Sequence, residues 1–173
     1  KKFNGSVDFH RTWTEYKNGF GDASGEYWLG NEALHQLTKS GGPYEWIFKA
    51  TAFDGTVQVS RYDDFSIGNE STNYLLSVGA LTHGSMASLT NKSPFTTYDN
   101  DNDLALSFNC AFRGDSGNYK NGGFWYEKCG GFQPNAQYSN NVGGVYQKFI
   151  FWKNFRGKSE SLKATSMRFR KKP

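Results

Sequence analysis

Apolar and polar side chains alternate in several stretches of the chain, which predicts β-strands. Residues 44–50 carry aromatic or small apolar side chains at every second position, and residues 57–60 continue the alternation with valines. Asp54-Gly55, between these two runs, is typical of a hairpin turn. Three more runs predict strands, at residues 74–78, 149–152 and 164–170. Together these runs predict an antiparallel sheet with one buried face.

Two short stretches show the period of an amphipathic helix instead. In residues 8–16 three aromatic side chains recur at i, i+4 and i+7, and Gly19 follows them. Residues 31–38 predict a second helix, with Asn31 as its N-cap and Gly41-Gly42 after its end. Helices and an antiparallel sheet in one chain predict an α+β fold.

The composition indicates one domain with an aromatic core. The chain has 173 residues, of which 17% are aromatic, 21% are charged and 20 are glycine. This length suits a single domain over residues 1–173, and this profile excludes a disordered chain. Periodicity fades between about residues 81 and 160, where we expect a loop-rich lobe that a metal ion or a disulfide stabilises. No apolar run approaches 18 residues, so no membrane span is expected.

An acidic stretch is the strongest chemical signal in the sequence. Asp99, Asp101 and Asp103 occupy alternate positions, and no basic residue occurs in residues 94–112. A hard divalent cation such as Ca²⁺, which binds six to eight oxygens, would neutralise these carboxylates. From the spacing alone, a solvated acidic turn remains the alternative. We expect Asp99 to lie outside the ligand set.

An EF-hand is the other interpretation of alternating aspartates, and the sequence excludes it. The sixth position of such a loop requires glycine and the twelfth a bidentate glutamate. This protein has Leu104 and Cys110 at those positions.

Two cysteines, Cys110 and Cys129, follow the acidic stretch. Their number is compatible with one disulfide or with two free thiols. Three Asn-x-Ser triplets are candidate N-glycosylation sites, at Asn4, Asn69 and Asn91, and they favour a secreted protein.

Signals for catalysis and for nucleic-acid binding are weak. Residues 114–117 read Gly-Asp-Ser-Gly, as in the nucleophile loop of trypsin-like proteases, but the histidines lie in no matching motif. Nucleophilic catalysis needs a base that a third group orients, so we expect no enzyme. The basic residues 168–172 form one terminal cluster, which is typical of a solvated tail, so no nucleic-acid partner is expected.

Several motifs resemble the fibrinogen C-terminal domain family, which includes ficolins, tachylectins and invertebrate fibrinogen-related proteins. They are Asn4-Gly5-Ser6-Val7-Asp8-Phe9, Trp28-Leu29-Gly30-Asn31-Glu32, Tyr98 to Asp103, Asn109-Cys110-Ala111 and Phe124 to Cys129. The resemblance runs over most of the sequence and implies a fibrinogen-like fold. Members of this family begin some tens of residues earlier, so we expect this protein to lack their N-terminal segment.

The resemblance also implies a calcium site and a disulfide. Asp101 and Asp103 would supply side-chain ligands, and Ala105 and Ser107 would supply backbone carbonyls. Cys110 would pair with Cys129, at the position of the second disulfide in the family.

Lectin members of the family bind acetyl groups beside the calcium loop, and the resemblance places such a pocket here. Its donors would be the backbone N–H groups of Cys129 and Gly130, held by a cis peptide bond between Lys128 and Cys129. Tyr146 and Tyr126 would form its aromatic wall. Two N–H donors suit an acetyl carbonyl, and aromatic faces suit its methyl group.

The resemblance implies non-catalytic recognition, with two alternatives for the ligand. The first is a secreted lectin of innate immunity that binds acetylated sugars or related microbial glycans. Weak single-site affinity would then require an oligomer in the full-length protein. The alternative is a protein-binding domain of a matrix, growth-factor or clotting-type protein. Gly130 favours this alternative, because many lectin members have histidine at that position.

Overall fold

The computed structural model describes residues 1–40, 42–85, 91–113, 119–129, 131–140 and 148–172. Its helical elements are α1 (Trp13–Asn18), α2 (Asn31–Thr38), the 3₁₀ turn η1 (Glu70–Thr72) and α3 (Lys153–Arg156). Its strands are β1 (Phe20–Gly21), β2 (Tyr27–Trp28), β3 (Tyr44–Thr51), β4 (Val57–Tyr62), β5 (Ser66–Ile67), β6 (Leu76–Ser77), β7 (Leu81–His83), β8 (Phe95–Thr96), β9 (Phe112–Arg113), β10 (Tyr119–Lys120), β11 (Phe124–Trp125), β12 (Phe132–Gln133), β13 (Phe151–Trp152) and β14 (Ala164–Lys171).

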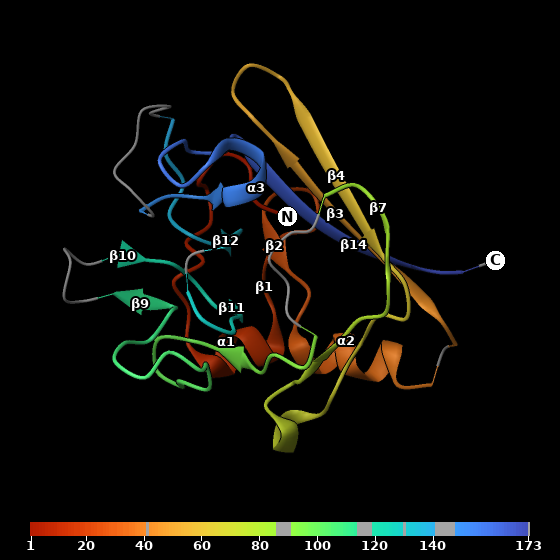
Figure 1. The fold of residues 1–173 in the computed structure, drawn as a ribbon. Coiled ribbons are helices and arrows are strands. Elements are labelled where there is room, and N and C mark those ends of the chain that lie inside the picture. The colour runs from red at the N-terminus through yellow and green to blue at the C-terminus, as the bar shows by residue number, and fades with distance from the viewer. Residues whose placement is uncertain (41, 86–90, 114–118, 130, 141–147, 173) are drawn as a thin grey trace.

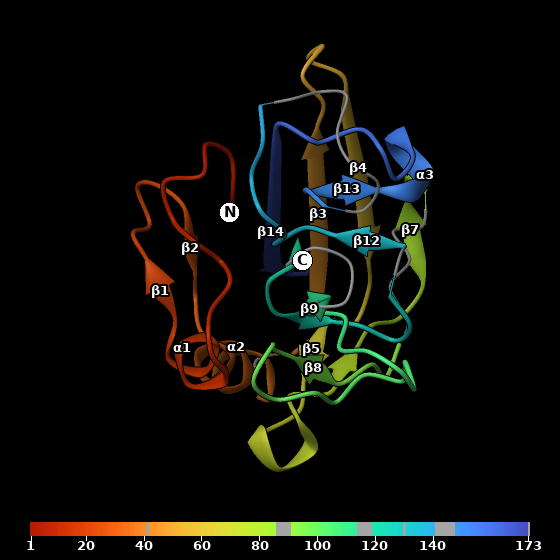
Figure 2. The same ribbon diagram turned by 90° about the vertical axis from the view of Figure 1, so that its left-hand side faces the viewer.

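An antiparallel sheet in the order β14-β3-β4-β7 is the main scaffold. The C-terminal strand β14 pairs with β3 over its full length, from Ala164 opposite Thr51 to Lys171 opposite Tyr44. The sheet stands on one side of the molecule, and the helices and the loop-rich lobe lie on the other (Figures 1 and 2). The α+β class, the antiparallel sheet and the returning C-terminal strand are therefore confirmed.

The predicted hairpin joins β3 and β4. Gly55 has a φ of +87°, which glycine adopts without strain, and its N–H donates to the carbonyl of Ala52 at 3.1 Å. The N–H of Ala52 in turn donates to the carbonyl of Thr56 at 2.9 Å. The Asp54-Gly55 turn sets the register in which Thr51 lies opposite Val57.

Aromatic side chains fill the core between the sheet and the rest of the protein. Trp46 and Phe48 point inward from β3, and Phe48 meets Phe132 edge to face at 4.5 Å between ring centroids. Trp125 is buried beside Phe95 at 5.0 Å, and its indole N–H donates to the carbonyl of Tyr74 at 2.8 Å. The Phe48–Phe132 contact ties the lobe to the sheet, and so does the contact of Trp125 with Trp46 at 6.2 Å between ring centroids, because β11 and β12 belong to the lobe.

The first helix is shorter than the sequence predicts. It begins at Trp13, because Thr12 and Glu15 form a capping box that fixes its first turn. The Thr12 N–H donates to the Glu15 carboxylate at 2.8 Å, and the Glu15 N–H donates to the Thr12 hydroxyl at 3.3 Å. Residues 8–12 precede the helix, so Phe9 reaches the core from a loop rather than from a helical turn.

The second helix has the predicted bounds, but its predicted N-cap is wrong. The N-cap position belongs to Gly30, and Asn31 lies inside the helix. The Asn31 side chain is buried and accepts the indole N–H of Trp28 at 2.9 Å, so it is not available to cap the backbone. The C-cap is Lys39, whose N–H donates to the carbonyl of His35. Of the predicted Gly41-Gly42 stop, Gly41 is outside the described residues.

The predicted strand at residues 74–78 is also wrong in extent. Only Leu76–Ser77 form strand β6, because Asn73 and Tyr74 have positive φ values of 53° and 47°, which are incompatible with extended backbone. At the C-terminal side, the run at residues 149–152 contributes the two-residue strand β13.

A buried carboxylate organises the N-terminal loop. Glu26 is 1% exposed, just before β2, and its carboxylate accepts four backbone N–H groups. These donors are Phe3 at 2.5 Å, Asn4 at 2.7 Å, Gly5 at 2.9 Å and Val7 at 2.9 Å. Burial disfavours the charged form of Glu26, but the four hydrogen bonds outweigh it and lower the pKa below its usual 4.5.

No helix in the described part of the protein is both long enough and apolar enough to cross a membrane.

Candidate functional site

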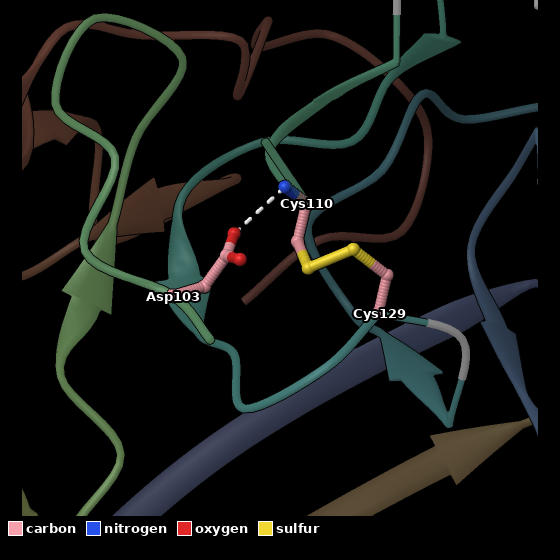
Figure 3. Close-up of side chains that lie close together, drawn as sticks. All are labelled: Asp103, Cys110 and Cys129. Atoms are coloured by element: carbon pink, nitrogen blue, oxygen red, sulfur yellow. Dashed lines mark hydrogen bonds between the residues drawn. A yellow bond between two sulfur atoms is a disulfide. The ribbon is translucent and has the colours of Figure 1, made fainter. Parts of the chain in front are cut away.

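The acidic stretch forms a loop between β8 and β9, beside the disulfide. Asp103 points at the backbone of Cys110, whose N–H donates to Asp103 Oδ2 at 2.8 Å (Figure 3). The N–H of Ala105 donates to Asp103 Oδ1 at 2.8 Å. The N–H of Asp103 itself donates to Asp101 Oδ1 at 3.3 Å. The loop is therefore wrapped around the Asp103 carboxylate, with the Asp101 carboxylate next to it.

The electrostatics of this loop suit a bound cation. Burial raises the pKa of Asp103 to about 6; the N–H groups of Cys110 and Ala105 oppose this rise, and the charge of Asp101 adds to it. Among the ion pairs of the described residues, none involves Asp101 or Asp103. A divalent cation would favour ionised carboxylates at this position.

The available donor atoms favour a hard cation. Asp103, Cys110 and Cys129 bring potential ligand atoms within 4.8 Å of one another. The two cysteines form a disulfide with a Cα–Cα distance of 5.2 Å, as the resemblance implies, so their sulfurs are not thiolate ligands. Carboxylate and backbone oxygens remain, and these are ligands for Ca²⁺ or Mg²⁺ rather than for Zn²⁺.

Asp99 has a structural role at the beginning of α1. Its carboxylate accepts the N–H of Trp13, the first helical residue, at 2.9 Å and the hydroxyl of Thr97 at 2.7 Å. An anionic acceptor at this position satisfies a free helical N–H group and complements the helix dipole. The structure therefore places Asp99 outside the Asp101–Asp103 cluster.

The two predicted carbonyl ligands lie on the same loop. Ala105 is half-buried and Ser107 is exposed. The loop is held at both ends, because Leu104 N–H donates to the carbonyl of Glu127 at 2.8 Å and the Asn109 amide donates to the carbonyl of Thr97 at 2.9 Å. The assignment of Ala105 and Ser107 as calcium ligands stays a prediction.

Of the five residues predicted to form the acetyl pocket, the structure describes three. Gly130 and Tyr146 lie outside the described residues. Lys128 is exposed and Cys129 is half-buried. The peptide bond between them is trans, so the predicted cis bond is wrong. A cis bond before a residue other than proline costs about 2.5–4 kcal/mol, and this loop closes without it.

Tyr126 is a core residue, so its predicted place on the pocket wall is wrong. It is 4% exposed, and its hydroxyl donates to the carbonyls of Gly122 at 3.0 Å and Asn121 at 3.3 Å. Burial raises the pKa of this phenol, and the nearby charge of Asp103 raises it further. The ring is enclosed by the protein and cannot contact a ligand.

Four exposed apolar side chains along residues 98–112 were not predicted from the sequence. Leu106 is fully exposed and Leu104 is 56% exposed, and both lie between the aspartates and Cys110. Tyr98 and Phe112, at the two ends of the same segment, are also exposed, and His10 stacks on Tyr98 at 4.4 Å between ring centroids. We call Tyr98, Leu104, Leu106 and Phe112 the apolar cluster. The apolar residues Leu104, Leu106 and Phe108, at alternate positions of a segment that is otherwise mostly polar, were the available signal.

All three candidate glycosylation sites are accessible. Asn4, Asn69 and Asn91 are exposed. Accessibility is necessary for modification, so these sites stay predictions.

A cavity of about 300 Å³ lies far from the acidic loop, between β2, α2 and the edge of β14. Most of its wall consists of aromatic core residues, among them Trp28, Trp46, Trp125 and Phe169. Its volume would suit a small ligand, and Lys1, Tyr27 and Arg168 are the titratable residues of its lining, but no acidic or nucleophilic side chain is among the described residues that line it. The cavity therefore gives no argument for a binding site.

The fold combines an antiparallel sheet with an acidic loop beside the Cys110–Cys129 disulfide. Residues 1–172 match the family described as the C-terminal globular domain of fibrinogen beta and gamma chains, and the protein belongs to this family. Fibrinogen-like domains of angiopoietins and related proteins are non-enzymatic binding domains, which agrees with the expectation that this protein is not an enzyme.

Relatives of known sequence include angiopoietin-2 of Mus musculus, with 39% identity over 96% of this chain, and ryncolin-4 of Cerberus rynchops, with 36% identity over 98%. The chain spans 33% of the length of the former and 48% of the latter. The fibrinogen-like globe domain of human ANGPTL6 has the same fold, with a TM-score of 0.87 and 36% identity over 99% of this chain and 76% of that domain. Lamprey fibrin D-dimer, solved with the peptide Gly-His-Arg-Pro-amide, matches 97% of this chain and 58% of its own with a TM-score of 0.83 and 25% identity.

Proposed function

We propose that this chain is the protein-binding domain of a secreted protein, with its contact surface on the acidic loop. The observation that carries this proposal is the apolar cluster. Leu106 stands free of the protein surface, and Leu104, Tyr98 and Phe112 are exposed on the same segment. Exposed apolar side chains that gather on one segment, with polar residues around them, are typical of protein–protein contact sites.

The comparisons support a protein partner over a sugar. Angiopoietin-2 and the ANGPTL6 domain are similar to this chain over nearly all its length, and lamprey fibrin D-dimer was solved with a peptide ligand. The disulfide and three exposed glycosylation triplets support secretion. Binding of acetylated sugars and an oligomeric full-length protein remain predictions.

We also propose that Ca²⁺ stabilises the loop. Asp101 and Asp103 would hold the ion through their carboxylates, and Ala105 and Ser107 through their carbonyls. The ion would add a positive charge beside two carboxylates that have no ion pair among the described residues. It would thereby order the segment that carries Leu104 and Leu106.

Calcium should raise the thermal stability of the protein. At a concentration 100 times the dissociation constant, a ligand that binds only the folded state stabilises it by about 2.7 kcal/mol. We expect Asp103→Asn to abolish the difference in melting temperature between calcium and chelator. Asp99→Asn is the matched control, because Asp99 faces Trp13 and Thr97, and it should keep the full difference. If Asp103→Asn keeps the full calcium response, the ion does not bind where we place it.

Leu104→Ser combined with Leu106→Ser should weaken partner binding without loss of stability. Both side chains are exposed, so their removal costs the fold little, whereas complete burial of one leucine side chain in an interface contributes about 1.5–3 kcal/mol. The assay is surface plasmon resonance of the immobilised domain, in calcium, against a panel of purified extracellular ectodomains. We expect one ectodomain of the panel to bind the domain saturably. Its affinity for the double variant should be lower by at least about thirtyfold.

Leu29→Ser combined with Leu37→Ser is the control for that variant, because these leucines are exposed on other parts of the protein. The same domain is applied in parallel to N-acetylglucosamine resin. Calcium-dependent retention that free acetate releases, without any ectodomain binder, would reject the protein-binding proposal in favour of the lectin alternative.

A further inference from the structure

The sheet has an outer face on which Lys49, Val57, His83 and Arg168 are exposed. Trp46 and Phe48 of β3 point into the core, so Ile47 and Lys49 point to the opposite side. Figures 1 and 2 show the helices and the lobe on the core side of the sheet. The outer face is formed by alternate residues of its strands, namely Glu45, Ile47, Lys49 and Thr51 of β3, Val57, Val59 and Arg61 of β4, His83 of β7, and Ala164, Ser166, Arg168 and Arg170 of β14.

Strand pairing brings basic residues together on this face. Arg168 lies opposite Ile47, which lies opposite Arg61, so two arginines flank one isoleucine in a row across the sheet. His83 continues this row on β7. Lys49 occupies the next row of the same face. These residues come from four separate strands, and none of the basic clusters in the sequence predicts their convergence.

The positive charge of the outer face is not neutralised within the described part of the protein. Glu45 is the acidic residue of this face, and it pairs with Arg170 at 2.8 Å. The ion pairs of the described residues do not include Lys49, Arg61 or Arg168. Arg61 Nε is buried without a hydrogen-bond partner, although a guanidinium can donate five hydrogens. The face thus has two exposed cations, Lys49 and Arg168, beside the half-buried Arg61.

We propose that the outer face of the sheet binds a sulfated linear polysaccharide of the glycosaminoglycan class. Neighbouring strands lie about 4.8 Å apart, and residues on one face of a strand recur every 6.5–7 Å or so, which spreads the cations over an open surface. Such a surface suits a polymer that carries an anion on successive sugars. Arginine forms planar, paired hydrogen bonds with tetrahedral oxyanions, and the exposed Arg168 supplies such a group, with the charge of the half-buried Arg61 nearby.

The chemistry of the face argues against a nucleic acid. A duplex is recognised in its major groove by a helix or a two-stranded ribbon, whereas this face is a four-stranded surface. Single strands require aromatic rings on which bases stack, and no Phe, Tyr or Trp belongs to the outer face as defined above. A sulfated polysaccharide requires neither feature.

This surface is separate from the proposed protein-binding loop. Figure 1 shows β9, which follows the acidic loop, on the side of the molecule away from β14 and β3. The domain could therefore hold a matrix polysaccharide on one side and a protein partner on the other. The polysaccharide proposal does not depend on the identity of that partner.

The test is binding of the 173-residue domain to immobilised heparin over a series of salt concentrations. We expect binding near physiological salt that weakens steeply as salt rises, because counterions compete for the basic groups. Lys49→Glu combined with Arg168→Glu should weaken heparin binding by roughly tenfold or more and should flatten the salt dependence. Lys49→Gln combined with Arg168→Gln should show a smaller loss in the same direction, which guards against misfolding of the charge-reversed variant.

Lys120→Glu combined with Lys153→Glu is the matched control, with the same change in net charge at exposed positions in β10 and α3. It should bind heparin within about twofold of the wild type. Equal losses in both charge-reversed variants would mean that net charge alone drives binding and would overturn the proposal. Absence of binding at physiological salt would overturn it too, as would competition by double-stranded DNA or unsulfated hyaluronan that equals competition by heparin.

Discussion

Glu26→Ala is expected to lower the free energy of unfolding by about 3–5 kcal/mol. The substitution removes one acceptor that serves four backbone N–H groups of the N-terminal loop. It also leaves the Lys2 ammonium, which is 2% exposed, without the opposite charge that favours its charged form. Because natural domains are stable by about 5–15 kcal/mol, such a loss would unfold a sizeable fraction of the molecules on mild heating. Chemical denaturation at pH 7 measures it.

Glu26→Gln removes the negative charge but keeps a carbonyl oxygen that can accept hydrogen bonds, so it distinguishes the two contributions. A glutamine carbonyl can still accept N–H groups, so we expect a smaller loss, about 1–2 kcal/mol. The pH dependence should differ as well. The folded pKa of Glu26 is lowered, so its stabilisation is complete above the unfolded value near 4.5 and is lost as pH falls through the folded pKa. Glu26→Gln should lack this loss below pH 4.5. An alanine variant within about 1 kcal/mol of the wild type would contradict the role assigned to Glu26.

Removal of the disulfide is expected to destabilise the domain by about 3 kcal/mol, the value that the chain-entropy model gives for a loop of this length. Cys110 and Cys129 are 19 residues apart, and the substitutions are Cys110→Ala with Cys129→Ala. Calcium affinity should fall in parallel, because the Cys110 N–H donates to Asp103 and helps to position its carboxylate. Denaturation curves with and without calcium measure both effects.

Reduced wild-type protein is the control for the disulfide variant. It should show the same loss of stability and of calcium affinity, since the disulfide is broken without any change in sequence. If the alanine variant keeps the calcium affinity of the wild type, the acidic loop is positioned independently of the Cys110–Cys129 bridge.

Sequence reasoning located the β3–β4 hairpin and β14 well, because alternation and the Asp54-Gly55 turn are local signals that the sheet reinforces. It placed the helix boundaries less well. Thr12 caps α1 through a capping box that hydrophobic periodicity does not reveal. The Asn31 side chain accepts a hydrogen bond from Trp28 instead of capping α2. The strand at residues 74–78 was overextended because the left-handed backbone of Asn73 and Tyr74 follows from tertiary contacts.

At the candidate site too, some residues were suggested by local sequence patterns and others could be placed only by the folded structure. Asp101 and Asp103 were proposed as cation ligands from residue type and spacing, and this stays a prediction, whereas the Cys110–Cys129 disulfide was implied by the family resemblance and is present in the structure. Tyr126 was misplaced because the sequence does not distinguish a pocket aromatic from a core aromatic. Its hydroxyl is satisfied by the carbonyls of Asn121 and Gly122, and only the folded protein brings these groups together.

The sequence by itself determined the family, the fold class and the position of the acidic loop, because each is carried by a local motif or a short-range pattern, and the disulfide followed from the resemblance to the family. The tertiary structure alone decided which side chains are exposed and which converge. Leu104 and Leu106 became contact candidates only when the loop was seen to leave them outside the core. Likewise, Arg61 and Arg168 lie 107 positions apart in the sequence, from 168 minus 61, and become neighbours across β3 through long-range strand pairing.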